Sequence, residues 1–165
     1  YVSSLYWNEL EKMPIKKVTK TLQNNSKNNG IKNLLIMVDD EGDLASKNKN
    51  KRKKSIDNHK KWIEMAYELG CHSIRVNLNG EKKKDKWIEY SSKSLTQLCL
   101  IAKKDKINII VENHGGLSSN ASYLAEVMKN VNLNNCGTLP DFGNFCIEKI
   151  DPENYFSQCI YEYDK

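Results

Sequence analysis

The sequence lacks the marks of several specialised protein classes. No apolar run approaches the roughly 18 residues that a membrane span needs, and no signal peptide is visible in these residues. Gly115 and Gly116 stand in no dinucleotide-binding glycine pattern and no phosphate-loop lysine follows them, so nucleotide binding is poorly supported. The five cysteines are odd in number and have no C-x-x-C spacing, which argues against a disulfide framework and a zinc cluster. With these classes excluded, the sequence indicates a globular protein. A cytoplasmic location is favoured, unless a preceding segment carries an export signal.

The charge excess of the chain is small and uneven. The 26 basic and 21 acidic side chains give a formal net charge of +5, and much of the excess lies in residues 47–54. Lysine and asparagine are frequent throughout, which indicates a general compositional bias, so we expect no nucleic-acid partner. Hydrophobic residues make up 39% and charged residues 28%, a balance that predicts a folded domain instead of a disordered chain.

Short apolar runs alternate with helical periodicity along the chain, without the turn signals of hairpins. Strands are predicted at residues 31–38, 73–77, 107–111 and 136–141, with a strand tail at residues 1–2. Helices are predicted in the second half of residues 5–29, from Ser55 to Gly70, at residues 85–104 and 121–131, and from Asp151 onward. This order predicts an α/β fold with a parallel sheet and right-handed crossovers.

The spacing of the strands fits two architectures. Their ends fall at Asp39, Asn77, Glu112 and Asp141, at intervals of 38 (77−39), 35 (112−77) and 29 (141−112) residues. A (β/α)₈ barrel averages about 31 residues per unit, and a doubly wound sheet fits as well. In both folds ligands gather at the carboxyl ends of the strands. The connection at residues 39–54 is long enough for a lid or substrate-binding loop, with a merely solvated loop as the alternative.

Two carboxylates stand out at that edge of the sheet. Glu112 directly follows a buried strand, where a charge is costly unless a cation or several donors compensate it. Asp141 follows the next strand in the same way. Each carboxylate either caps a neighbouring helix or accepts loop amides, or it binds a hard divalent cation such as Mg²⁺ or Mn²⁺, which carboxylate oxygens suit.

Other polar side chains are expected near these carboxylates. Arg75 and Asn77 alternate with apolar residues, so both point towards the same rim. Arg75 either clamps a substrate group or forms a salt bridge to a carboxylate on a neighbouring strand. His114 either donates to a substrate or packs under the loop. His59, on the polar side of a helix, and His72, before a strand, are expected to be structural.

Three segments resemble the sugar phosphate isomerase/epimerase family of xylose isomerase-like TIM barrels. They are residues 70–77 (GCHSIRVN), 111–116 (VENHGG) and 141–145 (DFGNF), and the likeness covers about residues 34–145. The resemblance implies a (β/α)₈ TIM barrel with parallel strands alternating with helices. Residues 1–165 would form one partial barrel domain, a fragment that lacks the first strands and the last two.

The resemblance also implies a metal site. In that family a divalent ion, often Mn²⁺, is held by a Glu, an Asp, a His and a second Glu. Glu112 matches the first ligand and Asp141 the second, and the other two would lie beyond Lys165. Mn²⁺ is favoured, with Mg²⁺, Co²⁺ and Zn²⁺ as alternatives. Glu112 would also be the catalytic group that moves a proton beside a carbonyl, through an enediolate. The resemblance places Asn144 against the substrate. Together with Arg75, Asn77 and His114, which their positions at the strand ends suggest, it completes the predicted contacts with a small carbohydrate or sugar phosphate.

The expected function is a divalent-metal-dependent isomerase or epimerase of sugars or sugar phosphates, with a homo-oligomer as a possible assembly when full length. Epimerases of the family often have His at the position of Asn144, so both reactions stay open. A polyol dehydratase of the superfamily and a non-catalytic carbohydrate-binding or regulatory protein are the alternatives. An abasic-site endonuclease is disfavoured because its zinc cluster needs more than three histidines. Because half a barrel leaves strand edges open, the 165-residue chain alone is expected to be inactive and to bind metal weakly.

Overall fold

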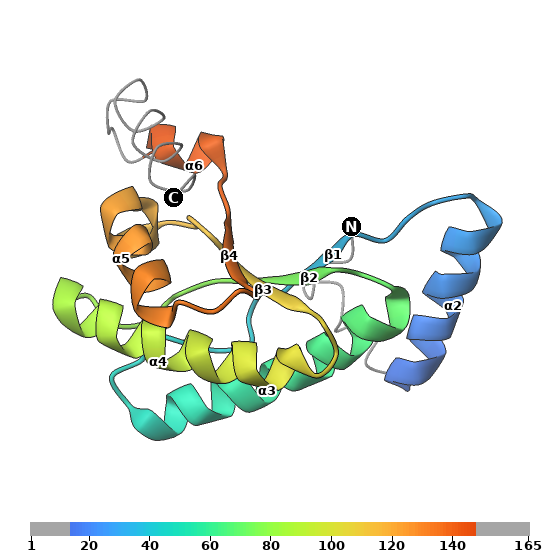
Figure 1. Cartoon of the computed structure of the whole chain (residues 1–165), viewed down its shortest axis with the longest axis horizontal. Helices are drawn as coiled ribbons and strands as arrows, with labels where there is room; N and C mark the ends of the chain where they lie inside the picture. The colour runs from blue at the N-terminus through green and yellow to red at the C-terminus, as the bar shows by residue number, and fades with distance from the viewer. Residues whose placement is uncertain (1–13, 148–165) are drawn as a thin grey trace.

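A four-stranded parallel sheet lies at the centre of the protein (Figure 1). The structure, a computed structural model, describes residues 14–147. Its strands are β1 (Leu35–Met37), β2 (Ser73–Val76), β3 (Asn108–Glu112) and β4 (Cys136–Leu139). They lie side by side in chain order, and each pairs in parallel with the next. The predicted parallel α/β order is therefore confirmed.

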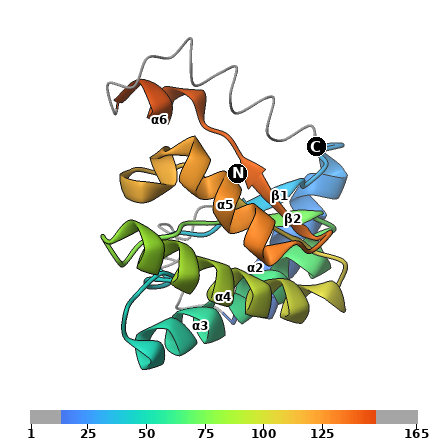
Figure 2. The same ribbon diagram turned by 60° about the vertical axis from the view of Figure 1, so that its left-hand side comes forward.

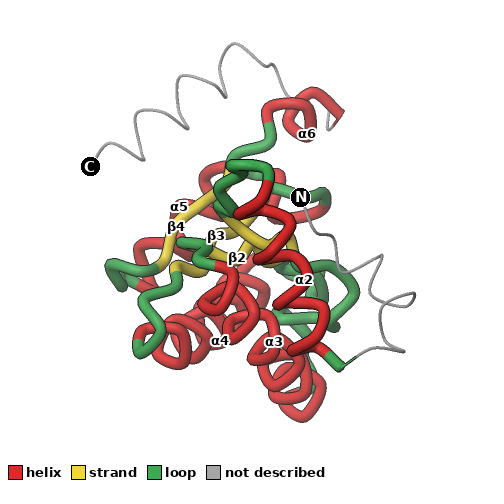
Figure 3. The backbone as a smooth tube through the Cα atoms, turned by 90° about the vertical axis from the view of Figure 1, so that its right-hand side faces the viewer, coloured by secondary structure: helices red, strands yellow, loops and turns green. Residues whose placement is uncertain are grey.

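Helices cover one face of this sheet. They are α3 (Lys49–Leu69), α4 (Lys84–Lys103) and α5 (Ala121–Val131), preceded in the chain by α2 (Ile15–Asn28). The short η2 (Gly116–Ser119) follows β3, and α6 (Phe142–Ile147) lies beyond the end of β4. Figure 2 shows α5, α4 and α3 following one another as a single layer, and Figure 3 shows the strands on one side of α3 and α4. α2 packs against α3 at the end of the layer. No helix within residues 14–147 has the length and hydrophobicity of a membrane span.

The two faces of the sheet differ in chemistry because successive strand residues point to opposite sides. Residues on the helix side are fully buried and apolar, and they form the core with side chains from the helices: Ile36, Ile74, Val76, Ile109, Val111, Trp62, Leu95, Leu98 and Val127. On the other face the register places Met37, Arg75 and Ile110 in one row. Polar residues follow that row at the carboxyl ends of the strands, where the predicted site lies.

The first predicted strand is too long. Residues 31–38 are almost continuously apolar, yet only Leu35–Met37 pairs with β2, while Ile31 is 62% and Leu34 51% exposed. An apolar run identifies residues suited to a strand, but the length of a strand also depends on a neighbour to pair with. The predicted limits of this strand, residues 31–38, are therefore wrong at the N-terminal end.

The helix predicted from Ser55 begins earlier, at Lys49. The Asn48 side chain accepts hydrogen bonds from the amides of Asn50 (2.9 Å) and Lys51 (3.2 Å), which caps the helix. Lysine and arginine are good helix formers, so the basic run continues from this cap as helix. The connection after β1 is correspondingly shorter than the predicted residues 39–54.

Two histidines outside the site have contrasting positions. His59 is buried and its Nδ1–H donates to the carbonyl oxygen of Ser55 at 2.7 Å, so its placement on the polar side of the helix was wrong. His72 is exposed and directly precedes β2, at the end of the sheet opposite the predicted site. The strand tail predicted at residues 1–2 and the helix predicted from Asp151 lie outside the described residues.

The connections after β1 and β2 are joined to each other. Ala45 pairs with Gly80: the Ala45 amide donates to Asn79 O and the Glu81 amide to Ala45 O, both at 2.9 Å. Gly80 has φ 138°, and a Cβ atom there would lie 2.5 Å from the carbonyl carbon of Ala45. Only glycine therefore allows the two loops to approach this closely.

Candidate active site

Arg75 lies at the centre of the charged groups at the carboxyl ends of β1, β2 and β3. Its side chain, on the central strand of the three, is almost completely buried. Nη1 donates to Asp39 Oδ1 at 2.5 Å and to Val38 O at 3.1 Å, and Nε lies 2.8 Å from Glu112 Oε2. Nε and Oε2 do not meet hydrogen-bond geometry, so this contact is an ion pair. The salt bridge predicted as one alternative for Arg75 is confirmed, and its contact with a substrate stays a prediction.

The register of the sheet explains why Arg75 reaches Glu112. Arg75 pairs with Ile110, and Glu112 lies two residues further along β3, so both side chains leave the same face. Glu112 is 5% exposed. A buried charge of either sign is costly without its partner, so each side chain stabilises the other in this position.

Asp39 completes the charged cluster on the side of β1. Besides Arg75 it accepts a hydrogen bond from Asn77 Nδ2 at 2.8 Å. Burial alone would raise the pKa of Asp39, but the hydrogen bonds and charge of Arg75, together with Asn77, lower the pKa below its ordinary value. The Oδ1 atom of Asn77 is buried and accepts no hydrogen bond from the residues that the structure describes. Asp39 lies two residues beyond β1, where the predicted strand ended, yet it was not among the predicted site residues.

The second oxygen of Glu112 faces two predicted site residues. Nδ1 of His114 lies 3.3 Å from Oε1, and Nδ2 of Asn144 donates to the same oxygen at 3.4 Å. His114 comes from the loop after β3 and Asn144 from α6 after β4. The structure thus brings Glu112, Arg75, His114 and Asn144 together, while Asn77 joins them through Asp39.

Asp141 is held beside this group by Asn113. Asn113 Nδ2 donates to Asp141 O at 2.9 Å, and the Asp141 amide donates to Asn113 Oδ1 at 2.6 Å. The Asp141 carboxylate is exposed, and its Oδ1 accepts the amides of Gly143 and Asn144 at the start of α6. Asn113 was missed by sequence reasoning, although an asparagine between Glu112 and His114 at a buried strand end was a visible signal.

The carboxylates of Glu112 and Asp141 are of the type that binds a hard divalent cation, but they are too few to complete its coordination shell. Carboxylate oxygens suit such a cation, and Glu112 and Asp141 follow neighbouring strands. Within residues 14–147, no group of three or more His, Cys, Asp and Glu side chains is arranged to hold a metal ion. Arg75 also engages Glu112 Oε2, which leaves Oε1 as the freer oxygen. The described residues would supply part of a coordination shell.

Two hollows adjoin the charged cluster. One of about 570 Å³ is lined by the His114–Leu117 segment, by residues 78–82 and by Trp87. A smaller one of about 210 Å³ includes Asn77, His59 and acidic residues 40, 41 and 43. The first has the size of a typical small-molecule site and contains a predicted substrate residue, His114.

Comparison with known proteins identifies the family. The model described as xylose isomerase-like TIM barrel matches residues 4–164. No curated protein matches the sequence significantly.

Three solved structures illustrate the likeness in fold. D-psicose 3-epimerase from Clostridium cellulolyticum H10, solved with D-tagatose, is 18% identical with a TM-score of 0.73 over 91% of this chain and 55% of that one. The probable 3-DHS dehydratase AsbF from Bacillus anthracis is 18% identical with a TM-score of 0.72, over 95% and 57%. The IOLI protein with a bound zinc atom is also 18% identical with a TM-score of 0.72, over 87% and 52%.

The chain spans about half the length of these structures. At this level of identity they show the fold, and the four parallel strands with their crossover helices correspond to part of a (β/α)₈ barrel. With the family model matching almost from end to end, the chain belongs to the xylose isomerase-like TIM barrel family.

Proposed function

We propose that the complete protein is a divalent-metal-dependent isomerase or epimerase of a sugar or sugar phosphate, acting by proton transfer through an enediolate. The main support is Glu112, a buried carboxylate at the carboxyl end of a barrel strand whose Oε1 faces His114 and Asn144. Active sites of TIM-barrel enzymes lie at this end of the strands. The sugar epimerase among the structural neighbours agrees with this assignment.

Glu112 and Asp141 would hold the cation. Their oxygen ligands favour Mn²⁺, with Mg²⁺, Co²⁺ and Zn²⁺ as alternatives, and one structural neighbour contains zinc. When bound, the cation would stabilise negative charge on the substrate oxygens. Asn113 serves this site indirectly, because its two hydrogen bonds fix the backbone of Asp141.

Glu112 would also transfer the proton. Its carboxylate takes a proton from the carbon beside the substrate carbonyl, the C–H electron pair forms the carbon–carbon double bond of the enediolate, and the carbonyl oxygen becomes the enediolate oxygen. Isomerisation is completed when Glu112 returns the proton to the neighbouring carbon and the hydroxyl proton passes from one enediolate oxygen to the other. Epimerisation is completed when a second acid protonates the same carbon from the opposite face, while Glu112 keeps the proton it took. Because Arg75 holds Oε2, Oε1 is the oxygen that would face the substrate.

The other residues would bind the sugar. His114 and Asn144, which contact Oε1, would exchange this contact for substrate hydroxyls. The buried Asn77 Oδ1 would accept a hydrogen bond from a hydroxyl group. Arg75 is enclosed by two carboxylates, so we assign it mainly to the orientation of Glu112, with substrate contact as a secondary role.

Proton exchange tests the proposal directly. The complete protein, with Mn²⁺, is incubated in D₂O with a panel of ketoses and ketose phosphates, and deuterium incorporation is followed by NMR. The Glu112→Gln variant should lose exchange by about 10²-fold or more while its circular dichroism is unchanged. Glu64→Gln, an exposed position on α3, is the matched control and should retain activity.

Three results would contradict the assignment. Exchange near the wild-type rate in Glu112→Gln would exclude that residue as the proton-transfer group. A product that has lost water would support the polyol dehydratase instead. Sugar binding without any exchange would support a non-catalytic carbohydrate-binding protein.

A further inference from the structure

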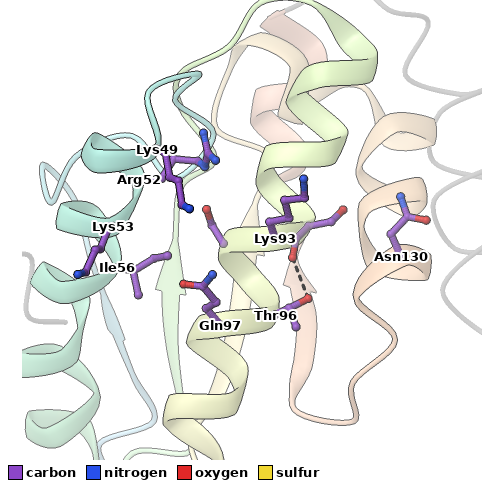
Figure 4. Close-up of a pocket in the computed structure, with 10 residues that line it drawn as sticks. Lys49, Arg52, Lys53, Ile56, Lys93, Thr96, Gln97 and Asn130 are labelled. Carbon is purple, nitrogen blue, oxygen red and sulfur yellow. Dashed lines mark hydrogen bonds between the residues drawn. The ribbon is translucent and has the colours of Figure 1, made fainter.

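We propose that α3 and α4 form a second binding site, which takes a small anion carrying two or more phosphate groups. The site, here called the basic groove, is a hollow of about 780 Å³ on the helical layer. Figure 4 shows basic side chains of α3 on one wall, α4 opposite and α5 beyond it. The residues that define the basic groove are Lys49, Arg52, Lys53, Lys93, Gln97 and Asn130. None of them belongs to the candidate active site, so this proposal is independent of the proposed function.

Three cations of the groove come from the start of α3. Lys49, Arg52 and Lys53 are spaced i, i+3 and i+4 on α3. In Figure 4 Lys49 and Arg52 point towards α4, and Lys53 lies on the outer side of α3 at the edge of the groove. The first turn of α3 contains no acidic residue, although the positive end of the helix dipole favours acidic side chains there. The arrangement is electrostatically unfavourable for the helix itself, and a bound anion would relieve it.

No carboxylate among the described residues forms an ion pair with these three cations. The salt bridges in residues 14–147 involve other lysines of α3, such as Lys60 and Lys61, and none joins Lys49, Arg52 or Lys53. Lys53 does act on Asp57, one turn further along α3, because its charge helps to lower the pKa of that carboxyl. The charges of Lys49 and Arg52 are therefore the ones most available to a ligand.

Arg52 is held in place by uncharged partners. Its Nη1 donates to the carbonyl oxygen of Ser46 at 2.6 Å, and its guanidinium lies 4.4 Å from the ring centroid of Tyr90 on α4. These contacts orient the side chain without neutralising it. Less conformational entropy is then lost when a ligand binds.

The wall opposite α3 adds donors without adding negative charge. Gln97 of α4 and Asn130 of α5 are exposed and offer amide N–H groups. Lys93 contributes a fourth cation, whose Nζ lies 2.6 Å from Glu89. No Asp or Glu lines the groove itself. This lining suits phosphate oxygens.

The shape favours a small ligand over a nucleic acid. The hollow has the volume of a small-molecule site, and its three unpaired cations occupy little more than one turn of helix. Nucleic-acid binding sites instead present basic side chains along an extended stripe. Two or three phosphate groups would match the number of cations.

Titration of the complete protein with inorganic triphosphate tests the proposal. Isothermal calorimetry at low ionic strength should show saturable binding, at least about 10-fold tighter than for orthophosphate. Lys49→Gln/Arg52→Gln/Lys53→Gln should weaken triphosphate binding by about 10-fold or more. Lys16→Gln/Lys17→Gln/Lys20→Gln removes the same charge from exposed positions of α2 and should change the affinity less than about 2-fold.

The folded state of the variants is checked by thermal unfolding, and both triple variants should remain folded at the temperature of the titration. In the groove variant, relief of repulsion in α3 offsets the loss of the contacts that Arg52 makes with Ser46 and Tyr90. A single variant, Arg52→Lys, keeps the charge but removes the planar fork, and it should weaken triphosphate binding measurably. Equal weakening by both triple variants would show only non-specific attraction and overturn the proposal. Tighter binding of a short DNA duplex than of triphosphate would identify a nucleic-acid surface instead, and an absence of saturable binding would also overturn it.

Discussion

Arg75 and Glu112 form an ion pair of 2.8 Å between β2 and β3, with side chains 3% and 6% exposed. Arg75 simultaneously binds Asp39, so one cation serves the carboxylates of both neighbouring strand ends. The arrangement fixes Oε2 of the proposed catalytic glutamate before any ligand arrives.

Removal of the guanidinium should destabilise the fold strongly. Arg75→Met leaves Glu112 buried without its cation, and we expect the free energy of unfolding in urea to fall by about 3–5 kcal/mol. Adding Glu112→Gln should recover part of this loss. The exposed Lys103→Met should change stability by less than about 0.5 kcal/mol. If Arg75→Met lowered the free energy of unfolding no more than Lys103→Met does, the structural role of the ion pair would be contradicted.

Asn113 should matter for both stability and the metal site. Its buried amide makes two hydrogen bonds to the Asp141 backbone, so Asn113→Ala should lower the free energy of unfolding by about 1–3 kcal/mol. Asn113→Asp keeps the oxygen that accepts the Asp141 amide but loses the N–H donor to Asp141 O. Comparing its metal affinity with that of Asn113→Ala therefore shows how much each of the two hydrogen bonds contributes. In the complete protein, both variants should bind Mn²⁺ more weakly than wild type; unchanged affinity in Asn113→Ala would show that Asp141 does not depend on this anchor.

The 165-residue chain by itself should bind Mn²⁺ weakly. Two candidate carboxylates lie in the described residues, and one of them already pairs with Arg75. Calorimetry should give a Kd of about 10⁻⁴ M or weaker, the range of incomplete carboxylate sites, and Asp141→Asn should weaken it further. Tight Mn²⁺ binding by this chain would overturn the ligand assignment.

His59 should make stability depend on pH. Burial is the largest cause of its lowered pKa, opposed by the Ser55 carbonyl and the charge of Glu41. Below the unfolded-state pKa of about 6.5 the unfolded chain binds the proton more readily, so the free energy of unfolding decreases as pH falls from there towards the folded-state pKa. Urea unfolding between about pH 7.5 and pH 5 should show a smaller decrease in His59→Gln than in wild type. His72→Gln, at an exposed position, is the control. If the free energy of unfolding of His59→Gln decreased with pH as much as that of wild type, His59 would not be the cause of the pH dependence.

Helices with a regular stripe of apolar residues were predictable from the sequence. α5 was predicted with its observed limits because Leu124, Val127 and Val131 recur at helical spacing, and the structure adds that Asn120 caps its start. The start of α3 was missed because its cap, Asn48, lies within a lysine-rich segment that resembles a loop. Local chemistry, not composition, decides where a helix begins.

The site residues that end an apolar run could be predicted from the sequence. The contacts that depend on strand pairing across the sheet could not. Glu112 and Asp141 could be found because each ends an apolar run. The resemblance supplied Asn144. Asp39 and Asn113 act through partners 36 and 28 residues away, and only the strand register brings these partners together. Their positions at strand ends were visible in the sequence, but their hydrogen-bond partners follow only from the folded sheet.

The pairing of Ala45 with Gly80 has a mechanical consequence. Two main-chain hydrogen bonds connect the loops. Because Gly80 has no side chain, the two backbones lie in direct contact. We therefore expect a displacement of the loop that follows Asp39 to move the loop that follows Asn77 with it.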